Sequence, residues 1–348
     1  MTYVRMMVIP LSALVLAGAC GPPAPRGTSA GRVVERAGLA MGSELHLTAW
    51  TADEAAAQSA FDAVFREFDR LDALMSVWKA DSDVIRVNAA AGEHAVPVDR
   101  DVRDILGIAQ QVSDWTGGRF DVTFGPLADV WKFDQDQDGI VPTADAIRAR
   151  LPLIDYRQIQ IDETAGTVFL KRKGMRIHLG GIGKGYAVDR AAKIFRDRGL
   201  RDFMIQAGGD MYVGGRRGDR PWKLGIADPR GEHKPFATVE LTDATFSTSG
   251  DYERFFIKDG VRYHHILDLG AGQPARLCRS VTLVTDRAVI ADALAKGVFI
   301  LGPEAGMALI ERLPGVAGVI VGANNDVLVS TALKDRFVLV RPPTDQQP

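Results

Sequence analysis

A glycine-rich stretch at residues 180–185, GGIGKG, constrains the fold of this chain more than any other feature. It follows an apolar run ending at Leu179 and precedes a helical pattern over about 186–198. Glycines at such a junction let backbone N–H groups approach and bind anions. The spacing excludes a P-loop, because Lys184 is followed by Gly185, and it excludes a dinucleotide motif, because the last glycine of GxGxxG is missing. We therefore expect a phosphate cradle of another kind.

Two further glycine-rich stretches support this expectation. They are Gly208-Gly209-Asp210 and residues 247–252, STSGDY. A single stretch of this type is usually a tight turn, but three in one chain favour a ligand that contains phosphate.

Helical and hairpin patterns alternate without a sustained βαβ order, which predicts an α+β fold. A chain of 348 residues with 46% hydrophobic residues can bury a large core. Apolar residues at helical spacing predict helices at 53–75, after Asp99, at 186–198, 289–300 and 303–313, with Ser82 and Thr143 capping shorter ones. The expected strands are 33–50 as a hairpin around 41–43, then 158–161, 167–170, 175–179, 203–206, 222–226, 237–241, 254–258, 281–284, 318–321 and 337–340.

The first twenty residues are typical of a secreted bacterial lipoprotein. Arg5 precedes an apolar run over 6–19 that is too short to span a membrane, and the run ends before Cys20. We predict a signal peptide at 1–19, lipidation of Cys20, a flexible tether over 20–32, one domain over 33–343 and a tail over 344–348. The protein would then be anchored to a membrane facing the periplasm, with ordinary secretion as the alternative.

Charge and cysteine content restrict the partners. A formal net charge of −2 and a pI near 6.3 give no basic field for nucleic acid. If Cys20 is acylated, Cys278 has no partner for a disulfide, and we expect it to be a small buried residue.

Two pairs of residues can carry acid–base or ionic chemistry. His265 precedes Asp268 by three residues, which suits proton transfer, although His264 and His265 could also be hydrogen-bonding residues at a strand end. Asp292 lies in an otherwise apolar helix, where a carboxylate needs a cation or a cap. Lys296, four residues later, could supply that charge internally.

An acidic run at 134–139, DQDQDG, matches the first half of a calcium loop, with Asp145 near the position of the last ligand. The flanking sequence is not a helix pair, and Thr143 and Asp145 suit the start of the next helix. A solvated acidic loop is therefore the alternative to Ca²⁺ binding.

Taken in order, the motifs resemble those of the ApbE-type FAD:protein FMN transferases. The resemblance covers nearly all of the chain after the tether. The motifs are 41–43 (MGS), 75–78 (MSVW), 117–123 (GGRFDVT), 178–192 (HLGGIGKGYAVDRAA), 207–210 (AGGD), 248–252 (TSGDY), 265–268 (HILD) and 291–295 (ADALA).

The resemblance implies an α+β fold related to the T-fold, with FAD between sheet and loops. Such enzymes use Mg²⁺ to split the FAD diphosphate, pass FMN to a threonine or serine of a partner protein, and release AMP. His265 would be the base and Asp268 a second catalytic residue. The metal would be held by the Gly181 carbonyl, Asp292 and the position of Lys296. The residues implied at FAD are Met41 and Trp78, on either side of the flavin ring, with Arg119, Phe120, Asp121, His178, Lys184, Ser249, Gly250 and Ile266.

The chain departs from the family pattern at three places. His178 replaces the usual Asp, and residues 268–272, DLGAG, lack the usual Arg and hydroxyl. Lys296 replaces the metal-binding Thr, and an ammonium cannot ligate a cation. Lys296 would either swing away and leave a weaker metal site, or occupy the metal's place. The alternatives to a transferase are an FAD-binding carrier or assembly factor, and an FAD pyrophosphatase.

Overall fold

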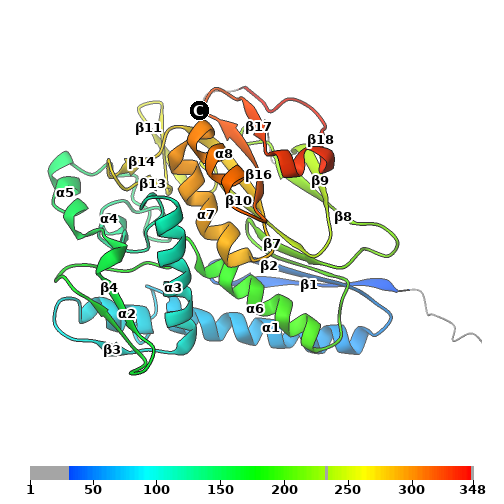
Figure 1. Ribbon diagram of the computed structural model, residues 1–348, viewed down its shortest axis with the longest axis horizontal. Coiled ribbons are helices and arrows are strands. Elements are labelled where there is room, and N and C mark those ends of the chain that lie inside the picture. Colours follow the sequence, from blue (N-terminus) through cyan, green and yellow to red (C-terminus); the bar gives the residue numbers. More distant parts are fainter. Residues whose placement is uncertain (1–30, 232–233, 346–348) are drawn as a thin grey trace, which may run out of the picture.

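The computed structural model describes residues 31–231 and 234–345, and its largest element is an antiparallel sheet of eight strands (Figure 1). The first two strands form the predicted hairpin, and its turn at Met41 and Gly42 has positive φ angles of 48° and 70°. In sheet order the strands are β1 (Arg32–Ala40), β2 (Ser43–Thr51), β6 (Phe203–Ala207), β7 (Asp210–Gly214), β10 (Ala244–Gly250), β15 (Cys278–Val284), β16 (Ala317–Gly322) and β17 (Val327–Val329).

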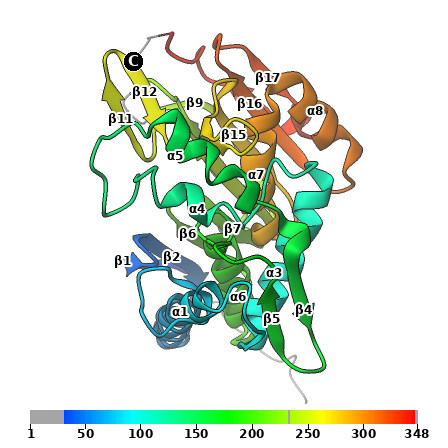
Figure 2. The ribbon, with the colours of Figure 1, turned by 90° about the vertical axis from the view of Figure 1, so that its left-hand side faces the viewer.

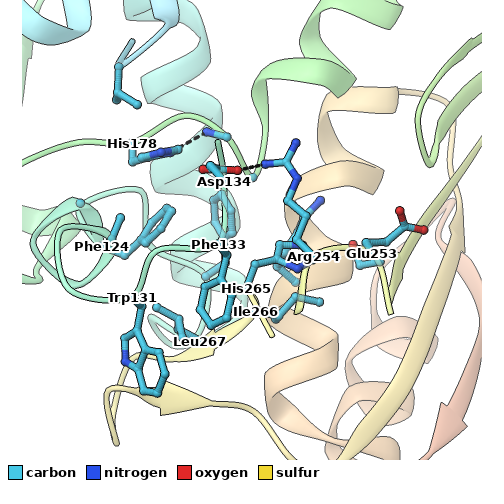
Figure 3. Close-up of a pocket in the computed structure, with 18 of the residues that line it drawn as sticks. Phe124, Trp131, Phe133, Asp134, His178, Glu253, Arg254, His265, Ile266 and Leu267 are labelled. Carbon is cyan, nitrogen blue, oxygen red and sulfur yellow. Dashed lines mark hydrogen bonds and ion pairs between the residues drawn. The ribbon is translucent and has the colours of Figure 1, made fainter. Parts of the chain in front are cut away.

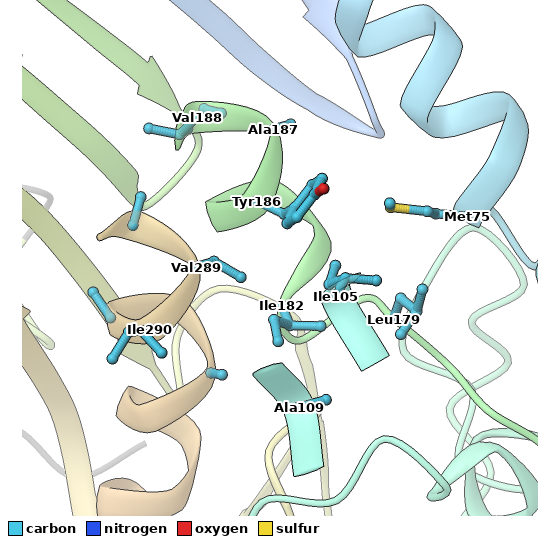
Figure 4. Packing of buried hydrophobic residues seen from close by; sticks show 14 of the residues in the cluster. Met75, Ile105, Ala109, Leu179, Ile182, Tyr186, Ala187, Val188, Val289 and Ile290 are labelled. Atoms are coloured by element: carbon cyan, nitrogen blue, oxygen red, sulfur yellow. The ribbon is translucent and has the colours of Figure 1, made fainter. Parts of the chain in front are cut away.

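Helices cover one face of this sheet (Figure 1). They are α1 (Glu54–Met75), α6 (Gly183–Asp197), α7 (Ala288–Leu301) and α8 (Pro303–Arg312). Asp53 caps α1 by accepting a hydrogen bond from the N–H of Ala56, and the buried face of α1 carries Phe61, Val64 and Phe68. Figure 4 shows the core where α1, α6 and α7 meet α3 (Arg100–Trp115), which Asp99 caps. This core fixes the start of α6 beside α7.

Smaller elements surround the sheet. A three-stranded sheet of β18 (Phe337–Leu339), β9 (Pro235–Leu241) and β8 (Trp222–Ala227) shares a second hydrophobic core with β7, β15 and β16. The remaining elements are β3 (Val96–Pro97), β5 (Thr167–Leu170), β4 (Ile159–Asp162), α2 (Asp83–Ala89), α4 (Gly125–Ala128), α5 (Ala144–Arg148), β11 (Phe255–Lys258), β12 (Val261–His264), β13 (Leu267–Asp268), β14 (Gln273–Pro274) and three 3₁₀ turns at Leu151–Leu153, Tyr156–Gln158 and Thr331–Arg336. Figure 2 shows α4 and α5 on the same side of the molecule as the hairpin of β11 and β12.

The predicted α+β class is confirmed, and most expected helices and strands are present. The strand expected at 175–179 is wrong, because this segment joins no sheet. Its His178 N–H donates to the carbonyl of Val122 at 2.8 Å, and its Arg176 carbonyl accepts from Gly125 at 3.2 Å. The segment therefore runs beside residues 122–125, where the irregular chain that we expected contains the short helix α4. β7 and β10 were not predicted.

The predicted signal peptide, Cys20 and the tether up to residue 30 lie outside the described residues. Within the described ranges, the helices are too short or too polar to cross a bilayer. Cys278 is buried, as expected. At the other end, Thr344 donates to Asp228 at 2.7 Å, so the start of the predicted tail is held against the domain.

Candidate active site

The three glycine-rich stretches line one cavity of about 370 Å³ beside the start of α6. This volume is within the range of small-molecule sites. Gly180 and Gly181 come from the loop before α6, Gly208 and Gly209 from the turn between β6 and β7, and Ser249 from the end of β10. Figure 3 shows aromatic and charged side chains projecting into the same space from residues 124–134 and 253–267. The three stretches, which are far apart in the sequence, therefore lie at one site.

Close packing explains why glycine occupies two of these positions. A Cβ added at Gly209 would lie 2.6 Å from the carbonyl oxygen of Thr248. A Cβ at Gly185 would lie 2.4 Å from the carbonyl oxygen of Ala288 and 2.7 Å from the Cβ of Asp292. Gly209 thus brings the turn between β6 and β7 against β10, and Gly185 brings α6 against α7, where its N–H donates to Asp292 at 2.9 Å. This N–H is therefore committed to Asp292 rather than to a phosphate.

Two lysines and two aspartates meet at the inner wall of the cavity. The ammonium of Lys184 lies 3.1 Å from the carboxylate of Asp210, and that of Lys296 is bonded to Asp292. Ser247 donates a further hydrogen bond to Asp210. Lys184 and Lys296 line the cavity, whereas Asp292 lies completely buried behind Lys296. Two fixed ammonium groups thus face the space between the glycine stretches.

Burial and neighbouring charges set the ionisation of this group. Burial alone would lower the pKa of Lys184. The negative charges of Asp210 and Asp292 together have a larger effect and raise this pKa above its ordinary value. Burial likewise opposes the ionisation of Asp210, yet Lys184 and Lys296 hold the pKa of Asp210 below its ordinary value. Burial raises the pKa of Asp292, with Asp210 adding to the effect and Lys296 opposing it.

The three residues predicted to hold Mg²⁺ are brought together, but their donor set does not fit a divalent cation. A Cβ at Gly181 would lie 4.0 Å from the Cε of Lys296, which places the lysine beside the predicted ligand. One oxygen of Asp292 is bonded to Lys296 and the other accepts the N–H of Gly185. Within 31–231 and 234–345 no three His, Cys, Asp or Glu side chains form a metal-binding group. An ammonium stands where a third oxygen ligand is needed.

His265 lines the cavity, and its Nδ1 is buried without a hydrogen-bond partner among the described residues. Burial lowers the pKa of His265 well below its ordinary value, and the charges of Arg254, Lys296 and Lys184 lower it further. The ring is therefore neutral near pH 7 and can accept a proton. His264 points elsewhere: its Nε2 lies 2.7 Å from the carbonyl oxygen of Ala275, and its Nδ1 accepts the N–H of Ile266. His264 is therefore a hydrogen-bonding residue at a strand end, the alternative to acid–base chemistry that the sequence left open.

Asp268 lies outside the cavity and bonds to Arg119 at 3.3 Å and to the N–H of Gly270 at 3.0 Å. The structure therefore does not place Asp268 at the reacting space beside His265. Asp268 instead holds the guanidinium of Arg119, which does line the cavity.

Trp78 and Met41 lie where a flat ring could be held. Trp78 is half exposed and belongs both to the main cavity and to an adjoining groove that Met41 lines. Met41 occupies the tip of the hairpin of β1 and β2, and a Cβ at Gly183 would lie 3.6 Å from its Cε. His178 lies in both spaces and accepts the N–H of Gly180 at 3.0 Å (Figure 3), and burial lowers its pKa.

The other predicted FAD-binding residues differ in position. Phe120, Ile266 and Ser249 line the cavity, and the Ser249 hydroxyl is buried without a partner in the described ranges. Asp121 also lines it, but one carboxylate oxygen accepts from Thr123 and the other from Tyr156, so it braces the surrounding loop. Gly250 lies outside both spaces and packs on the ring of Tyr252.

The cavity also contains an ion pair that the sequence did not predict. Arg254 bonds to Asp134, as Figure 3 shows, and Phe133 stacks on Phe256 with ring centroids 5.6 Å apart. No signal in the sequence joins residues 120 positions apart. The pairing also disfavours the calcium loop, because three of its four carboxylates are bound to basic groups. Asp134 is bonded to Arg254, Asp138 to Lys132 and Asp145 to Arg148.

Comparisons with known proteins identify the family. The ApbE family model matches residues 41–320. An FAD:protein FMN transferase of Treponema pallidum is 32% identical over 91% of this chain and 92% of its own length. One from Klebsiella pneumoniae is 32% identical over 88% of this chain and 94% of its own length.

Two solved structures resemble this fold over the same region. The ApbE protein of Thermotoga maritima has a TM-score of 0.81 and 30% identity, covering 88% of this chain and 99% of its own. The flavinyl transferase ApbE of Pseudomonas stutzeri has a TM-score of 0.78 and 30% identity, covering 88% of this chain and 97% of its own. The matched range includes every residue that lines the cavity. On sequence and fold together, this chain belongs to the ApbE family.

Proposed function

We propose that this protein is an FAD:protein FMN transferase. The observation that carries the proposal is the single cavity in which three glycine-rich stretches face two lysines and a neutral histidine. The two ammonium groups and the closely approaching glycine backbone suit the binding of a diphosphate. The neutral histidine suits the removal of a proton from a hydroxyl group. The relatives described above bear the name of this activity.

In the proposed reaction, a threonine or serine hydroxyl of an acceptor protein attacks the phosphorus atom on the FMN side of the FAD diphosphate. His265 takes the proton of the hydroxyl, and the bond from that phosphorus to the bridging oxygen breaks. AMP leaves with the bridging oxygen, and FMN stays attached to the acceptor through a phosphoester. His265 suits this role because its Nδ1 is buried and unpartnered within the described chain.

The side chains of this site support specific binding roles. Lys184 and Lys296 would donate charge-assisted hydrogen bonds to the diphosphate, and Met41 and Trp78 would hold the flavin ring in the adjoining groove. Arg119, held by Asp268, would contact the ligand at the rim. The Mg²⁺ dependence that the resemblance implies has no support in the donor set, so no step is assigned to a metal.

We also propose that the protein acts outside the cytoplasm, anchored to a membrane by an acylated Cys20. The support is the apolar run over 6–19 and the cysteine that follows it. Radiolabelled palmitate incorporated by the wild type, and lost in Cys20→Ala, would support this proposal. Incorporation that persists in the variant would contradict it.

A second function, an FAD-binding carrier, is favoured by one observation: Lys296, at the position where the family resemblance implies a metal-binding threonine, is bonded to Asp292. One assay separates the two functions. The purified domain is incubated with FAD and an acceptor protein, followed by a denaturing gel and chromatography of the nucleotides. Yellow fluorescence on the acceptor with AMP released would support the transferase. FAD bound without transfer would support the carrier, and free FMN with AMP but no labelled acceptor would indicate a pyrophosphatase.

A further inference from the structure

Helix α7 carries an ion pair at the inner wall of the cavity. Asp292 and Lys296 are one turn apart on this helix, and the ammonium of Lys296 is bonded to one oxygen of Asp292. The other oxygen of Asp292 accepts the N–H of Gly185, the third residue of α6. Asp292 is completely buried, whereas the side chain of Lys296 is 16% exposed and lines the cavity. The carboxylate thus holds the lysine from behind, and the ammonium faces the ligand space.

Burial disfavours the swung-away arrangement of Lys296 when no other cation takes its place beside Asp292. If the lysine left, the carboxylate of Asp292 would stay buried with only the N–H of Gly185 bonded to it. An ionised carboxylate without a cation is strongly disfavoured in such surroundings. Asp210 lies close enough to raise the pKa of Asp292 further, which adds to the demand for a nearby positive charge. The ion pair is therefore the stable arrangement of α7.

The charges around the cavity wall balance without a metal ion. Lys184 faces Asp210 and Lys296 faces Asp292, which gives two cations and two anions. A threonine in place of Lys296 would leave one uncompensated negative charge, and a divalent cation would then be needed. With lysine present, a divalent cation at the same place would be repelled by the ammonium.

We infer that the ammonium of Lys296 takes the place of a divalent cation, so that this protein binds the diphosphate of FAD without metal. The inference rests on the proposed function, because that function makes FAD the ligand. Lys296, beside Gly181, and Lys184, on the first turn of α6, direct two ammonium groups at the ligand space, where they can donate charge-assisted hydrogen bonds to the diphosphate oxygens. Each ammonium is held in place by its own buried carboxylate.

The experiment measures the dissociation constant of FAD by fluorescence titration, in EDTA and in excess Mg²⁺. The wild type is expected to bind FAD with the same constant, within twofold, under both conditions. Lys296→Thr is expected to bind at least tenfold more weakly in EDTA and to recover with Mg²⁺. Lys193→Thr is the control, because Lys193 lies exposed on α6 and pairs with Asp197 at 2.7 Å. This variant is expected to behave as the wild type does.

A second measurement does not depend on FAD affinity. Electron paramagnetic resonance of Mn²⁺ in the presence of FAD is expected to show no stoichiometric binding to the wild type and one bound ion in Lys296→Thr. Circular dichroism checks that the variant folds. If it does not, the comparison of wild type in EDTA and Mg²⁺ still decides the question.

Two outcomes would overturn the inference: FAD binding by the wild type that needs Mg²⁺, or stoichiometric Mn²⁺ binding to the wild type. Failure of the proposed function gives a different result. In that case FAD binds equally well in EDTA and Mg²⁺, but no FMN reaches the acceptor under either condition. The absence of any FAD binding by the folded wild type would overturn both.

Discussion

Lys184 and Asp210 form an ion pair of 3.1 Å that joins the first turn of α6 to the first residue of β7. The carboxylate is almost completely buried and also accepts the hydroxyl of Ser247 in β10. The pair therefore connects one helix to two central strands at the wall of the cavity. Because Lys184 also faces the cavity, the same side chain serves stability and ligand binding.

Lys184→Met is expected to lower the free energy of unfolding by about 3 kcal/mol, since it leaves Asp210 buried beside only one remaining lysine. FAD should bind at least tenfold more weakly. Urea unfolding and a fluorescence titration measure the two effects. The double variant Lys184→Met/Asp210→Asn should lose less stability than the two single variants added together. Strict additivity would show that the two residues do not interact.

His265→Asn is expected to reduce the rate of FMN transfer by about 10²- to 10⁴-fold, because the proton acceptor is lost. The FAD dissociation constant should stay within about threefold, since other residues of the cavity hold the diphosphate and ring. Transfer to an acceptor protein under single-turnover conditions measures the rate.

The pH profile gives an independent check on His265. Because burial lowers its pKa well below its ordinary value, the ring stays neutral as the pH falls from 8 to about 6.5. The wild-type rate should therefore show no loss over this interval. A loss that follows the ordinary titration of histidine would show that burial does not lower the pKa of this ring.

Trp78→Ala is expected to weaken FAD binding by about 1 kcal/mol or more, because the half-exposed indole offers a flat face to the flavin ring. Trp78→Tyr is the matched control, since it keeps an aromatic face, and should bind FAD within about threefold of the wild type. Flavin fluorescence titration measures both variants. If Trp78→Ala and Trp78→Tyr bound FAD equally well, the flavin ring would not lie against residue 78.

Local features of the fold could be predicted from the sequence, because they depend on neighbouring residues. The predicted caps at Ser82, Asp99 and Thr143 each accept the N–H of a residue two or three positions later. The spacing of Asp292 and Lys296 likewise predicted their ion pair.

Features that depend on distant residues could not be predicted in this way. β10 has the sequence ATFSTSG, which suits a loop, yet it lies in the middle of the sheet. Its buried Thr245 hydroxyl is paired with Thr285, 40 residues away. The pair of Arg254 and Asp134 depends on the same kind of long-range packing. The site residues were predicted from the resemblance to a family. That resemblance gives the order of the motifs along the chain and not the contacts between them.

His264 is expected to make the protein less stable in acid. Its Nε2 lies 2.7 Å from the carbonyl of Ala275, so this nitrogen carries the proton, and its Nδ1 accepts the N–H of Ile266. Burial lowers the pKa of His264 to about 4, below its ordinary value of 6.5. The unfolded chain binds the proton first, so stability is fully present above pH 6.5 and falls by about 3 kcal/mol as the pH drops to 4.

Urea unfolding at several pH values measures this effect, and His264→Gln should flatten the profile, because glutamine can still donate to Ala275. His94→Gln is the control, since His94 is exposed. Parallel pH profiles of wild type and His264→Gln would contradict the assignment.

Gly185→Ala is expected to destabilise the protein by about 2 kcal/mol or more, because backbone atoms cannot move aside easily. The added Cβ would lie 2.4 Å from the carbonyl oxygen of Ala288 and 2.7 Å from the Cβ of Asp292, forcing α6 away from α7. Gly107→Ala is the matched control, since Gly107 is exposed within α3 and a Cβ there meets nothing within 4 Å. Helix propensity should make the control neutral or more stable by about 0.5–1 kcal/mol. Thermal unfolding distinguishes the two, and FAD affinity should fall with Gly185→Ala alone, because only that change displaces Lys184 and Asp292 from the cavity wall.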